Sequence, residues 1–159
     1  MSTVVDFQVS LSSPSEARDQ LSPFPILEPL TATTHAAWPG VLVITVRGEV
    51  DMFTVPLLRT CLREQIRHSG PDVIVDLSEV GFLAAAGLTV LATAHKAAIA
   101  AGVAFRVVAN TRPVLRPLRV TELGAVLGCY PDLDSAQAAS SAPRLSEPHQ
   151  SVDKGRAGQ

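Results

Sequence analysis

Side chains that could catalyse a reaction or bind a metal are scattered along this 159-residue chain. The four histidines, His35, His68, His95 and His149, have no acidic or thiol partner nearby in the sequence. His95 falls on the apolar stripe of an expected helix, where a packed imidazole is more common than a catalytic one. Asp76 ends an expected strand, where α/β sheets often bind ligands, but a single carboxylate there more often forms a turn. These residues do not predict an active site.

Motifs that hold nucleotides, activate nucleophiles or bind zinc are also missing from the sequence. It contains no Gly-Lys-Ser or Gly-Lys-Thr of a phosphate-binding loop, and no GxGxxG, GxSxG or HExxH pattern. The two cysteines, Cys61 and Cys129, belong to no CxxC pair, so no metal site is expected. They are interpreted as reduced, half-buried thiols, with a redox pair as the alternative. We therefore expect a protein without enzyme activity and without a cofactor.

The composition favours recognition of another protein over binding of nucleic acid or lipid. Apolar residues make up 47% of the chain and aromatic residues 4%, which predicts an aliphatic core and no stacking surface for single-stranded nucleic acid. A net charge of −2 provides no basic field for nucleic acid or anionic lipid. Arg106, Arg112, Arg116 and Arg119 form one local basic cluster. It is interpreted as a solvated surface, with an interaction patch as the alternative.

Nothing in the sequence predicts secretion or insertion into a membrane. The N-terminus carries Asp6, Glu16 and several serines instead of the basic start and apolar run of a signal peptide. The sequence has no stretch of about 18 or more apolar residues that could cross a bilayer. We expect a cytoplasmic protein.

Strand and helix signals alternate through the middle of the chain. Residues 1–27, rich in Ser and Pro, are expected to form a flexible arm and residues 140–159 a disordered tail, which leaves one domain at 28–139. Strands are predicted at 28–35, 41–48, 72–80, 103–110 and 124–130, and helices at 55–68, 87–101, 113–123 and 133–139. This β-β-α-β-α-β-α-β-α order predicts an α/β fold with a mixed, mostly parallel sheet.

The helices carry recognisable faces and caps. Apolar spacing predicts that the helix at 55–68 buries Val55, Leu58, Leu62 and Ile66. Either Asp51 or Thr54 could be its N-cap, and Pro56 suits its first turn. In the helix at 113–123, Pro117 is expected to delay the start. The helix at 133–139 could be capped by Asp132 or Asp134. After a loop at 81–87, the helix at 87–101 has a second apolar face: Leu88, Leu91, Ala92, His95, Ala98 and Ile99.

Two segments occur together in a combination that points to a known family. Residues 43–52 (VITVRGEVDM) form a strand that ends in Gly-Glu-Val-Asp. Residues 73–91 (VIVDLSEVGFLAAAGLTVL) form a strand, a loop and a small-residue turn that opens an Ala/Leu-rich helix. Over residues 28–139 the chain resembles the STAS domain of bacterial anti-sigma factor antagonists. The resemblance implies a STAS-like α/β fold and a partner-switching function in transcription regulation: such antagonists bind an anti-sigma factor, usually a small kinase, and free a sigma factor.

The chain departs from this family at the turn before the second helix. In most relatives this turn reads Asp-Ser-Ser-Gly or Asp-Ser-Ala-Gly, and the kinase phosphorylates the first serine to break the complex. Here the turn is Ala84-Ala85-Ala86-Gly87, with Ala85 at the position of the phospho-acceptor. Because alanine has no hydroxyl, the resemblance implies an antagonist that is not controlled by phosphorylation at this site.

The resemblance also implies which residues contact the partner. They are Gly48, Glu49, Asp51, Thr54, Ala84, Ala85, Ala86, Gly87 and Leu88, with Arg59 as a further candidate. Gly48 also fits a plain turn glycine, and Asp51 a helix cap. Two alternatives stay open. One is a STAS-like scaffold or regulatory subunit of a transport ATPase or signalling complex, and the other is a small enzyme or nucleotide binder that uses the turn after residue 80.

Overall fold

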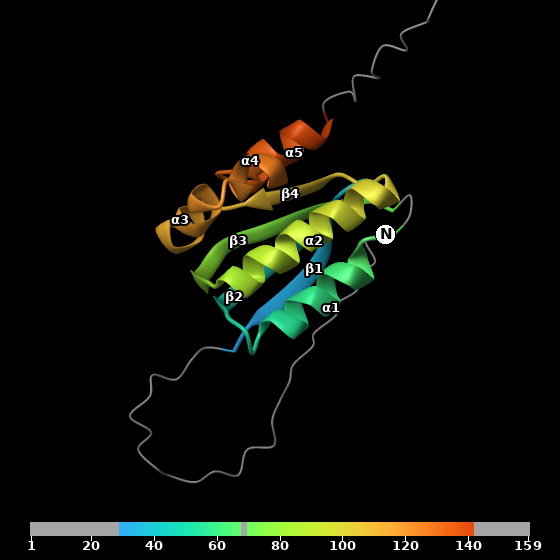
Figure 1. The fold of residues 1–159 in the computed structure, drawn as a ribbon. Coiled ribbons are helices and arrows are strands. Elements are labelled where there is room, and N and C mark those ends of the chain that lie inside the picture. The colour runs from blue at the N-terminus through green and yellow to red at the C-terminus, as the bar shows by residue number, and fades with distance from the viewer. Residues whose placement is uncertain (1–28, 68–69, 142–159) are drawn as a thin grey trace, which may run out of the picture.

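Five strands form one sheet in the order in which they follow each other along the chain (Figure 1). The computed structural model describes residues 29–67 and 70–141. The strands are β1 (Thr31–Trp38), β2 (Val41–Val50), β3 (Asp72–Leu83), β4 (Phe105–Val108) and β5 (Cys129–Tyr130). β1 is antiparallel to β2, and each later neighbouring pair is parallel. The predicted mixed, mostly parallel sheet is confirmed.

Helices cover both faces of this sheet. They are α1 (Val55–Gln65), α2 (Ala85–Ala101), α3 (Arg112–Val120), α4 (Leu123–Leu127) and α5 (Leu133–Ser141). Parallel strands that are neighbours in both sequence and space are joined by right-handed crossovers, which place the connecting helices on one face. Figure 1 shows α1 and α2 side by side across that face. α5 packs on the other face, against β3, β4 and β5.

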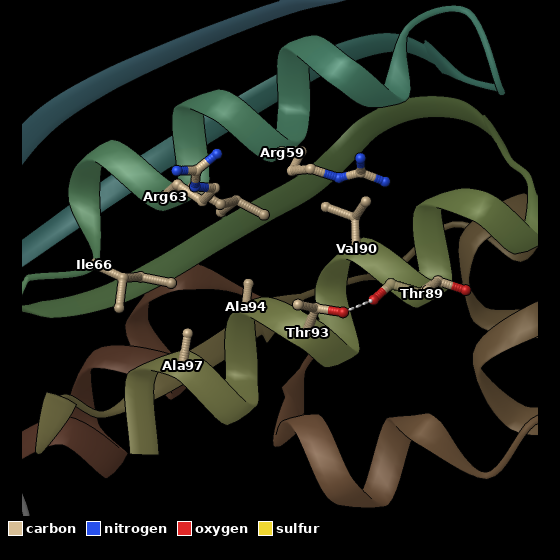
Figure 2. A pocket seen from close by; sticks show the side chains of 9 residues that line it. Arg59, Arg63, Ile66, Thr89, Val90, Thr93, Ala94 and Ala97 are labelled. Atoms are coloured by element: carbon tan, nitrogen blue, oxygen red, sulfur yellow. Dashed lines mark hydrogen bonds between the residues drawn. The ribbon is translucent and has the colours of Figure 1, made fainter. Parts of the chain in front are cut away.

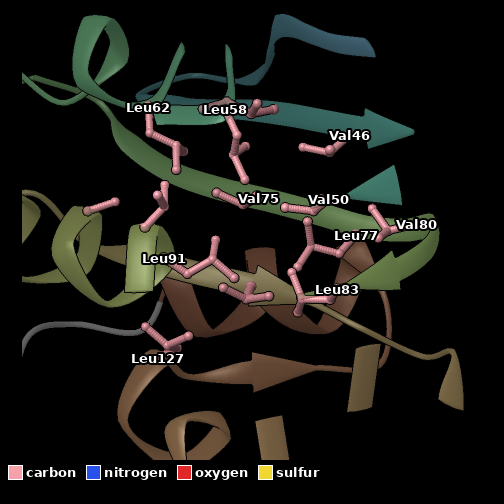
Figure 3. Packing of buried hydrophobic residues seen from close by; sticks show 14 of the residues in the cluster. Val46, Val50, Leu58, Leu62, Val75, Leu77, Val80, Leu83, Leu91 and Leu127 are labelled. Atoms are coloured by element: carbon pink, nitrogen blue, oxygen red, sulfur yellow. The ribbon is translucent and has the colours of Figure 1, made fainter. Parts of the chain in front are cut away.

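The core follows from the alternation of side chains along the strands. In β3, Val73, Val75 and Leu77 point into the main cluster beneath α1 and α2, of which Figure 3 shows a part. Ile74 points the opposite way, into a smaller cluster with Ala136 of α5. Each of the four strand residues is fully buried. The sheet is therefore apolar on both faces, as a mostly parallel sheet requires.

The segment predicted as a loop at 81–87 is different in the structure. β3 continues to Leu83, and α2 begins at Ala85, two residues before its predicted start. The reason is a long-range pairing, because Val50 lies opposite Leu83 in the parallel ladder and extends both strands. A local sequence window does not contain this pairing.

The last part of the domain also departs from the prediction. The segment predicted as a strand at 124–130 overlaps the unpredicted helix α4, which begins at Leu123, and has only two strand residues, which pair with Val107 and Val108. Gly128 adopts a φ of +64° after α4, and this turns the chain from helix to strand. Pro117 lies inside α3 without delaying its start, since the helix begins at Arg112.

The end of α5 corrects one predicted boundary. The helix extends to Ser141, beyond the expected domain end at 139. The Ser140 hydroxyl donates a hydrogen bond to Asp72 Oδ2 over 2.8 Å, and the Arg106 guanidinium donates to the carbonyl of Ala139 over 3.0 Å. Asp132 accepts a 2.7 Å bond from the N–H of Ser135, which confirms this residue as the cap.

Some remaining boundaries shift as well. β1 occupies Thr31–Trp38 instead of 28–35, β4 is shorter than predicted, and α1 ends at Gln65 before the expected His68. His68, His149, the arm at 1–27 and all but the first two residues of the tail lie outside the described residues.

The buried face of α2 is also rotated relative to the prediction. Leu88, Leu91 and Ala98 are buried as expected, but Ile99 is 65% exposed. Val90 and Ala94 are buried in its place. The helix packs against α1 as well as against the sheet, so its apolar surface covers more than one stripe.

Candidate functional site

Two turns lie next to each other at the end of the sheet where the carboxyl ends of β2 and β3 meet. The first consists of Asp51–Thr54 and is called the polar turn below; the second consists of Ala84–Ala86 and is called the alanine turn. Val50 and Leu83 are paired at the ends of their strands, and the N–H of Ala84 donates a 2.8 Å hydrogen bond to the carbonyl of Val50. The pairing of the strands therefore brings together two segments that are more than thirty residues apart in the sequence.

Side chains hold the shape of the polar turn. Asp51 Oδ1 accepts hydrogen bonds from the N–H groups of Phe53 and Thr54, both over 2.9 Å. The Thr54 hydroxyl donates to the carbonyl of Glu49 over 2.8 Å and accepts from the N–H of Asp51 over 2.9 Å. Both residues proposed as N-cap of α1 therefore order the turn, although Thr54, which occupies the cap position, makes no side-chain cap bond.

These bonds also affect the charge of the turn. The bond from the Thr54 N–H, followed by that from Phe53, holds the pKa of the Asp51 carboxyl below its ordinary value. The ionised form is thus favoured in the folded state. Its contribution to stability is present above the ordinary pKa of an aspartate and is lost as the pH falls through the lowered value.

In the alanine turn, no side chain caps the backbone N–H groups at the start of α2. The side-chain bond to this turn comes from the Thr89 hydroxyl, which donates to the carbonyl of Ala85 over 3.2 Å. Ala84 takes the N-cap position of α2 with extended backbone angles of φ −76° and ψ 163°, but it has no side-chain atom that can accept a bond. Its carbonyl accepts from the N–H groups of Gly87 and Leu88 over 2.9 and 3.2 Å. The side chain of Ala85 is exposed, and those of Ala84 and Ala86 are partly exposed. The turn presents a small apolar surface.

Gly87 and Leu88 lie beneath this surface and position it. A Cβ atom at Gly87 would stand 2.6 Å from Cγ1 of Val50 and 2.7 Å from Cδ1 of Leu83, which is too close for either contact. Leu88 is 6% exposed and belongs to the main core cluster. The absence of a side chain at Gly87 lets the first turn of α2 rest directly on the paired strand ends.

Gly48 and Glu49 lie in the strand that leads to the polar turn. Gly48 adopts a φ of +99°, which disfavours any residue with a side chain. It pairs with Val80, whereas Glu49 pairs with Phe82, so Gly81 is left as the extra residue of a bulge. Gly48 thus lies within β2, next to the bulge of the neighbouring strand, and is not a turn glycine.

Large apolar side chains surround the two turns. Met52 and Phe53 in the polar turn are 71% and 84% exposed, and Phe82, two residues before the alanine turn, is 49% exposed. Sequence reasoning did not include these three residues. The available signal was the presence of Met and Phe within an expected surface turn. Clustered exposed apolar side chains are typical of surfaces that bind another protein.

Arg59 lies outside the two turns, at a groove between α1 and α2. Figure 2 shows Arg59 and Arg63 on the α1 side of this groove and Thr89, Thr93 and Val90 on the α2 side. The groove has a volume of about 410 Å³ and a mostly apolar lining. Both threonine hydroxyls donate to carbonyls of their own helix, so they are already satisfied within α2.

The remaining candidates have structural positions. Asp76 Oδ1 accepts bonds from the N–H and the hydroxyl of Ser78 over 3.0 and 2.6 Å, but both residues lie within β3, next to a register shift against β2, so the predicted turn at a strand end is wrong. The His95 ring stands edge-on to Phe105 at 6.0 Å, as expected for a packed imidazole. His35 is exposed on β1. Among residues 29–67 and 70–141, no group of three His, Cys, Asp or Glu residues could hold a metal ion.

The two cysteines lie at opposite edges of the sheet. Cys61 is buried on α1, near the hydroxyl of Thr34 in edge strand β1, and Cys129 lies in β5 at the other edge. Burial raises the pKa of both thiols. Strands are spaced about 4.8 Å apart, so four intervals separate the edges by far more than a disulfide can span. The alternative of a redox pair within one chain is therefore wrong.

Comparisons with known proteins identify the family of this chain. The model of the family described as "STAS domain" matches residues 35–136. Anti-sigma-F factor antagonist RsfB of Mycobacterium tuberculosis is 32% identical over 97 residues, which cover 61% of this chain and 79% of that protein. No helix in the described part of the chain is long and apolar enough to cross a membrane.

Solved structures show the same fold. The crystal structure of an anti-sigma factor antagonist from Mycobacterium paratuberculosis is 34% identical, with a TM-score of 0.64, and the match covers 69% of this chain and 92% of that one. The Bacillus cell fate determinant SpoIIAA in its phosphorylated form is 13% identical, with a TM-score of 0.54, over 68% of this chain and 98% of that one, and it supports the fold alone. Since the family model matches well over half of its length, this chain belongs to the STAS domain family.

Proposed function

We propose that this protein is an anti-sigma factor antagonist that binds an anti-sigma factor through the alanine turn and the polar turn, and so frees a sigma factor. We further propose that serine phosphorylation at the usual family site does not control this binding. The chain acts as a binding protein and not as an enzyme, and its partner is a kinase-like anti-sigma factor. The antagonist names of RsfB and of the Mycobacterium paratuberculosis protein support the first statement.

The observation that carries the proposal is the exposed, hydroxyl-free tip of the alanine turn. Ala85 is exposed next to the paired ends of β2 and β3, with Met52, Phe53 and Phe82 around the same edge. Small side chains at the tip allow the backbone of a partner to approach closely, while the larger apolar groups supply area that is removed from water on binding.

Hydroxyl groups near the tip do not replace the missing serine. Thr54 donates to the carbonyl of Glu49, and Thr89 donates to the carbonyl of Ala85 one helical turn further on. Ser78 is partly buried and bonded to Asp76. A kinase that reached the tip would meet a methyl group at position 85.

The loss of the hydroxyl has a clear energetic meaning for an interface of this kind. A phosphate adds about −1.5 to −2 charges, which must be desolvated when the surface is covered by a partner. In an apolar contact, the cost of desolvating the phosphate opposes binding. A chain with Ala85 keeps its affinity for the anti-sigma factor whether or not that factor has hydrolysed ATP. The concentration of free sigma factor then depends on the amount of antagonist and not on phosphorylation of the antagonist.

The test is a titration of the purified protein against anti-sigma factors from the same genome, by calorimetry, with and without Mg-ATP. We expect direct binding with a dissociation constant that preincubation with ATP does not change, and no phosphate in the mass spectrum of the antagonist. Release of sigma factor from its complex with the anti-sigma factor is measured in parallel, because a scaffold or transporter subunit would not release it.

The matched variant restores the family pattern by combining Ala84→Asp with Ala85→Ser. It should accept phosphate and lose affinity only in the presence of ATP, while the wild-type chain does neither. Stoichiometric transfer of phosphate to the wild-type chain, or failure of every anti-sigma factor to bind it, contradicts the proposal.

A further inference from the structure

Three arginines on α3 carry positive charge that the described residues do not neutralise. Arg112, Arg116 and Arg119 follow each other at helical spacing and are all exposed. Arg106, the fourth member of the basic cluster in the sequence, is separate: it lies on β4 and reaches Asp72 at 3.9 Å as well as α5. Tertiary structure therefore divides the cluster into one structural arginine and a basic face on α3.

This arrangement is unfavourable for the isolated chain. Arg112 and Arg116 stand four residues apart, where like charges on a helix repel each other. Arg112 is also the first residue of α3, at the positive end of the helix dipole, and no acidic residue occupies the first turn. Within residues 29–67 and 70–141, ion pairs form at Arg47 and Arg106 but at none of the α3 arginines. An acidic partner would relieve both sources of repulsion.

An apolar groove lies beside these arginines. It has a volume of about 590 Å³, and its lining combines the end of β3 with α3: Phe82, Leu83, Arg112, Pro113, Arg116, Pro117 and Val120. Val120 is 77% exposed and Phe82 is 49% exposed. Apolar side chains together with two exposed guanidinium groups fit a segment that has carboxylates on one side and an apolar residue on the other.

The groove adjoins the alanine turn. Phe82 and Leu83 directly precede Ala84. The Leu83 side chain also packs against the start of α2, where its Cδ1 would stand 2.7 Å from a Cβ atom added to Gly87. Figure 1 shows α3, the end of β3 and the first turn of α2 at the same end of the sheet. A partner that covers the tip of the alanine turn therefore meets α3 next.

We propose that the interface with the anti-sigma factor extends from the alanine turn onto α3, where Arg112 and Arg116 bind an acidic, partly apolar segment of that factor. This inference rests on the proposed function, because it assigns a second part of the same interface. Positive charge at its edge also speeds the encounter with an acidic partner and makes the affinity depend on salt.

The experiment compares affinities for the anti-sigma factor, by calorimetry at low and high salt, between the wild-type chain and three variants. Combining Arg112→Glu with Arg116→Glu should weaken binding roughly tenfold or more and remove most of its salt dependence. Glutamate at position 112, in the first turn of α3, suits the helix dipole, and circular dichroism checks that the double variant is folded. Lys96→Glu is the matched control, since Lys96 is exposed on α2 about three turns from Ala85.

The third variant, Ala85→Asp, separates the two proposals. If Ala85→Asp weakens binding while the double arginine variant and Lys96→Glu bind like wild type, the assignment of α3 is overturned and the proposed function stands. If the wild-type chain binds no anti-sigma factor, both fall. A groove occupied by a second copy, or by residues 1–28 of the same chain, would leave the affinity for the anti-sigma factor unchanged in the arginine variant. In that case sedimentation, or deletion of residues 1–28, identifies the occupant and the α3 proposal is wrong.

Discussion

The helices α1 and α2 begin at the same end of the sheet, where β2 and β3 finish, but their first turns are held in different ways. In the polar turn, Asp51 and Thr54 satisfy backbone groups through their side chains. In the alanine turn no side chain accepts a bond from the N–H groups that open the helix, and the geometry depends on Gly87 resting against Val50 and Leu83. One turn is fixed by hydrogen bonds at the surface, and the other by close packing beneath it.

This difference shows how a turn can lose its polar residues and keep its position. Uncapped N–H groups at a helix start cost stability when no side chain accepts from them. Around the alanine turn, the ladder between Val50 and Leu83 and the bond from Ala84 to Val50 hold the backbone instead. The surface is then free to be apolar, which suits contact with a partner.

The largest effect is expected from the substitution Gly87→Ala, which tests whether close packing holds the alanine turn. Its Cβ would overlap with buried side chains of Val50 and Leu83, and overpacking of this kind costs about 1–3 kcal/mol, partly offset by the better helix propensity of alanine. We expect a lower midpoint of denaturation by urea. Gly81→Ala is the control, because a Cβ there has nothing within 4 Å and should change stability little. Equal stability of both variants would show that packing does not hold the alanine turn.

The substitution Thr54→Ala tests the polar turn in the same way. It removes the bond to the carbonyl of Glu49 and the acceptor for the N–H of Asp51, and should lower the free energy of unfolding by about 1–2 kcal/mol. Thr54→Ser keeps the hydroxyl and should retain most of the stability. Hydrogen exchange at the amide of Asp51 should become faster in the alanine variant alone. A turn that tolerates alanine as well as serine would not depend on this hydroxyl.

The smallest effect is expected from adding a cap to the alanine turn. Ala84→Ser places an acceptor at the N-cap of α2, where the N–H of Ala86 can donate to it, and should raise the free energy of unfolding by about 1 kcal/mol. Ala97→Ser, on the exposed middle of the same helix, is the matched control and should be slightly destabilising. A gain at Ala97 as large as that at Ala84 would mean that capping is not the cause.

Much of the fold could be predicted from local patterns. The β-branched run at 41–48 and the spacing of Val55, Leu58 and Leu62 gave the strand β2 and the buried face of α1. The order of elements then gave the mixed sheet, because chirality allows few ways to connect parallel strands. The ends of β2 and β3 were predicted too early, since their last residues are strands only through pairing with each other.

The candidate site could be predicted only in part. The position of the alanine turn followed from the family resemblance, and the sequence placed Asp51 and Thr54 before α1. Met52, Phe53 and Phe82 were missed, because a large apolar residue in the sequence is expected to be buried until the fold shows that nothing covers it. The basic cluster was also divided only by the fold, since Arg106 and the arginines of α3 are close in sequence but lie on different elements.

The sequence alone determined the chemistry available at each position. It placed a methyl group at Ala85, where no phosphate ester can form, and it determined the alternation that buries both faces of the sheet. Only the tertiary structure decided which groups are neighbours and which are exposed, because parallel pairing joins Val50 to Leu83 across a whole helix. This pairing places the polar turn beside the alanine turn, and α3, which packs against β3, lies at the same end of the sheet.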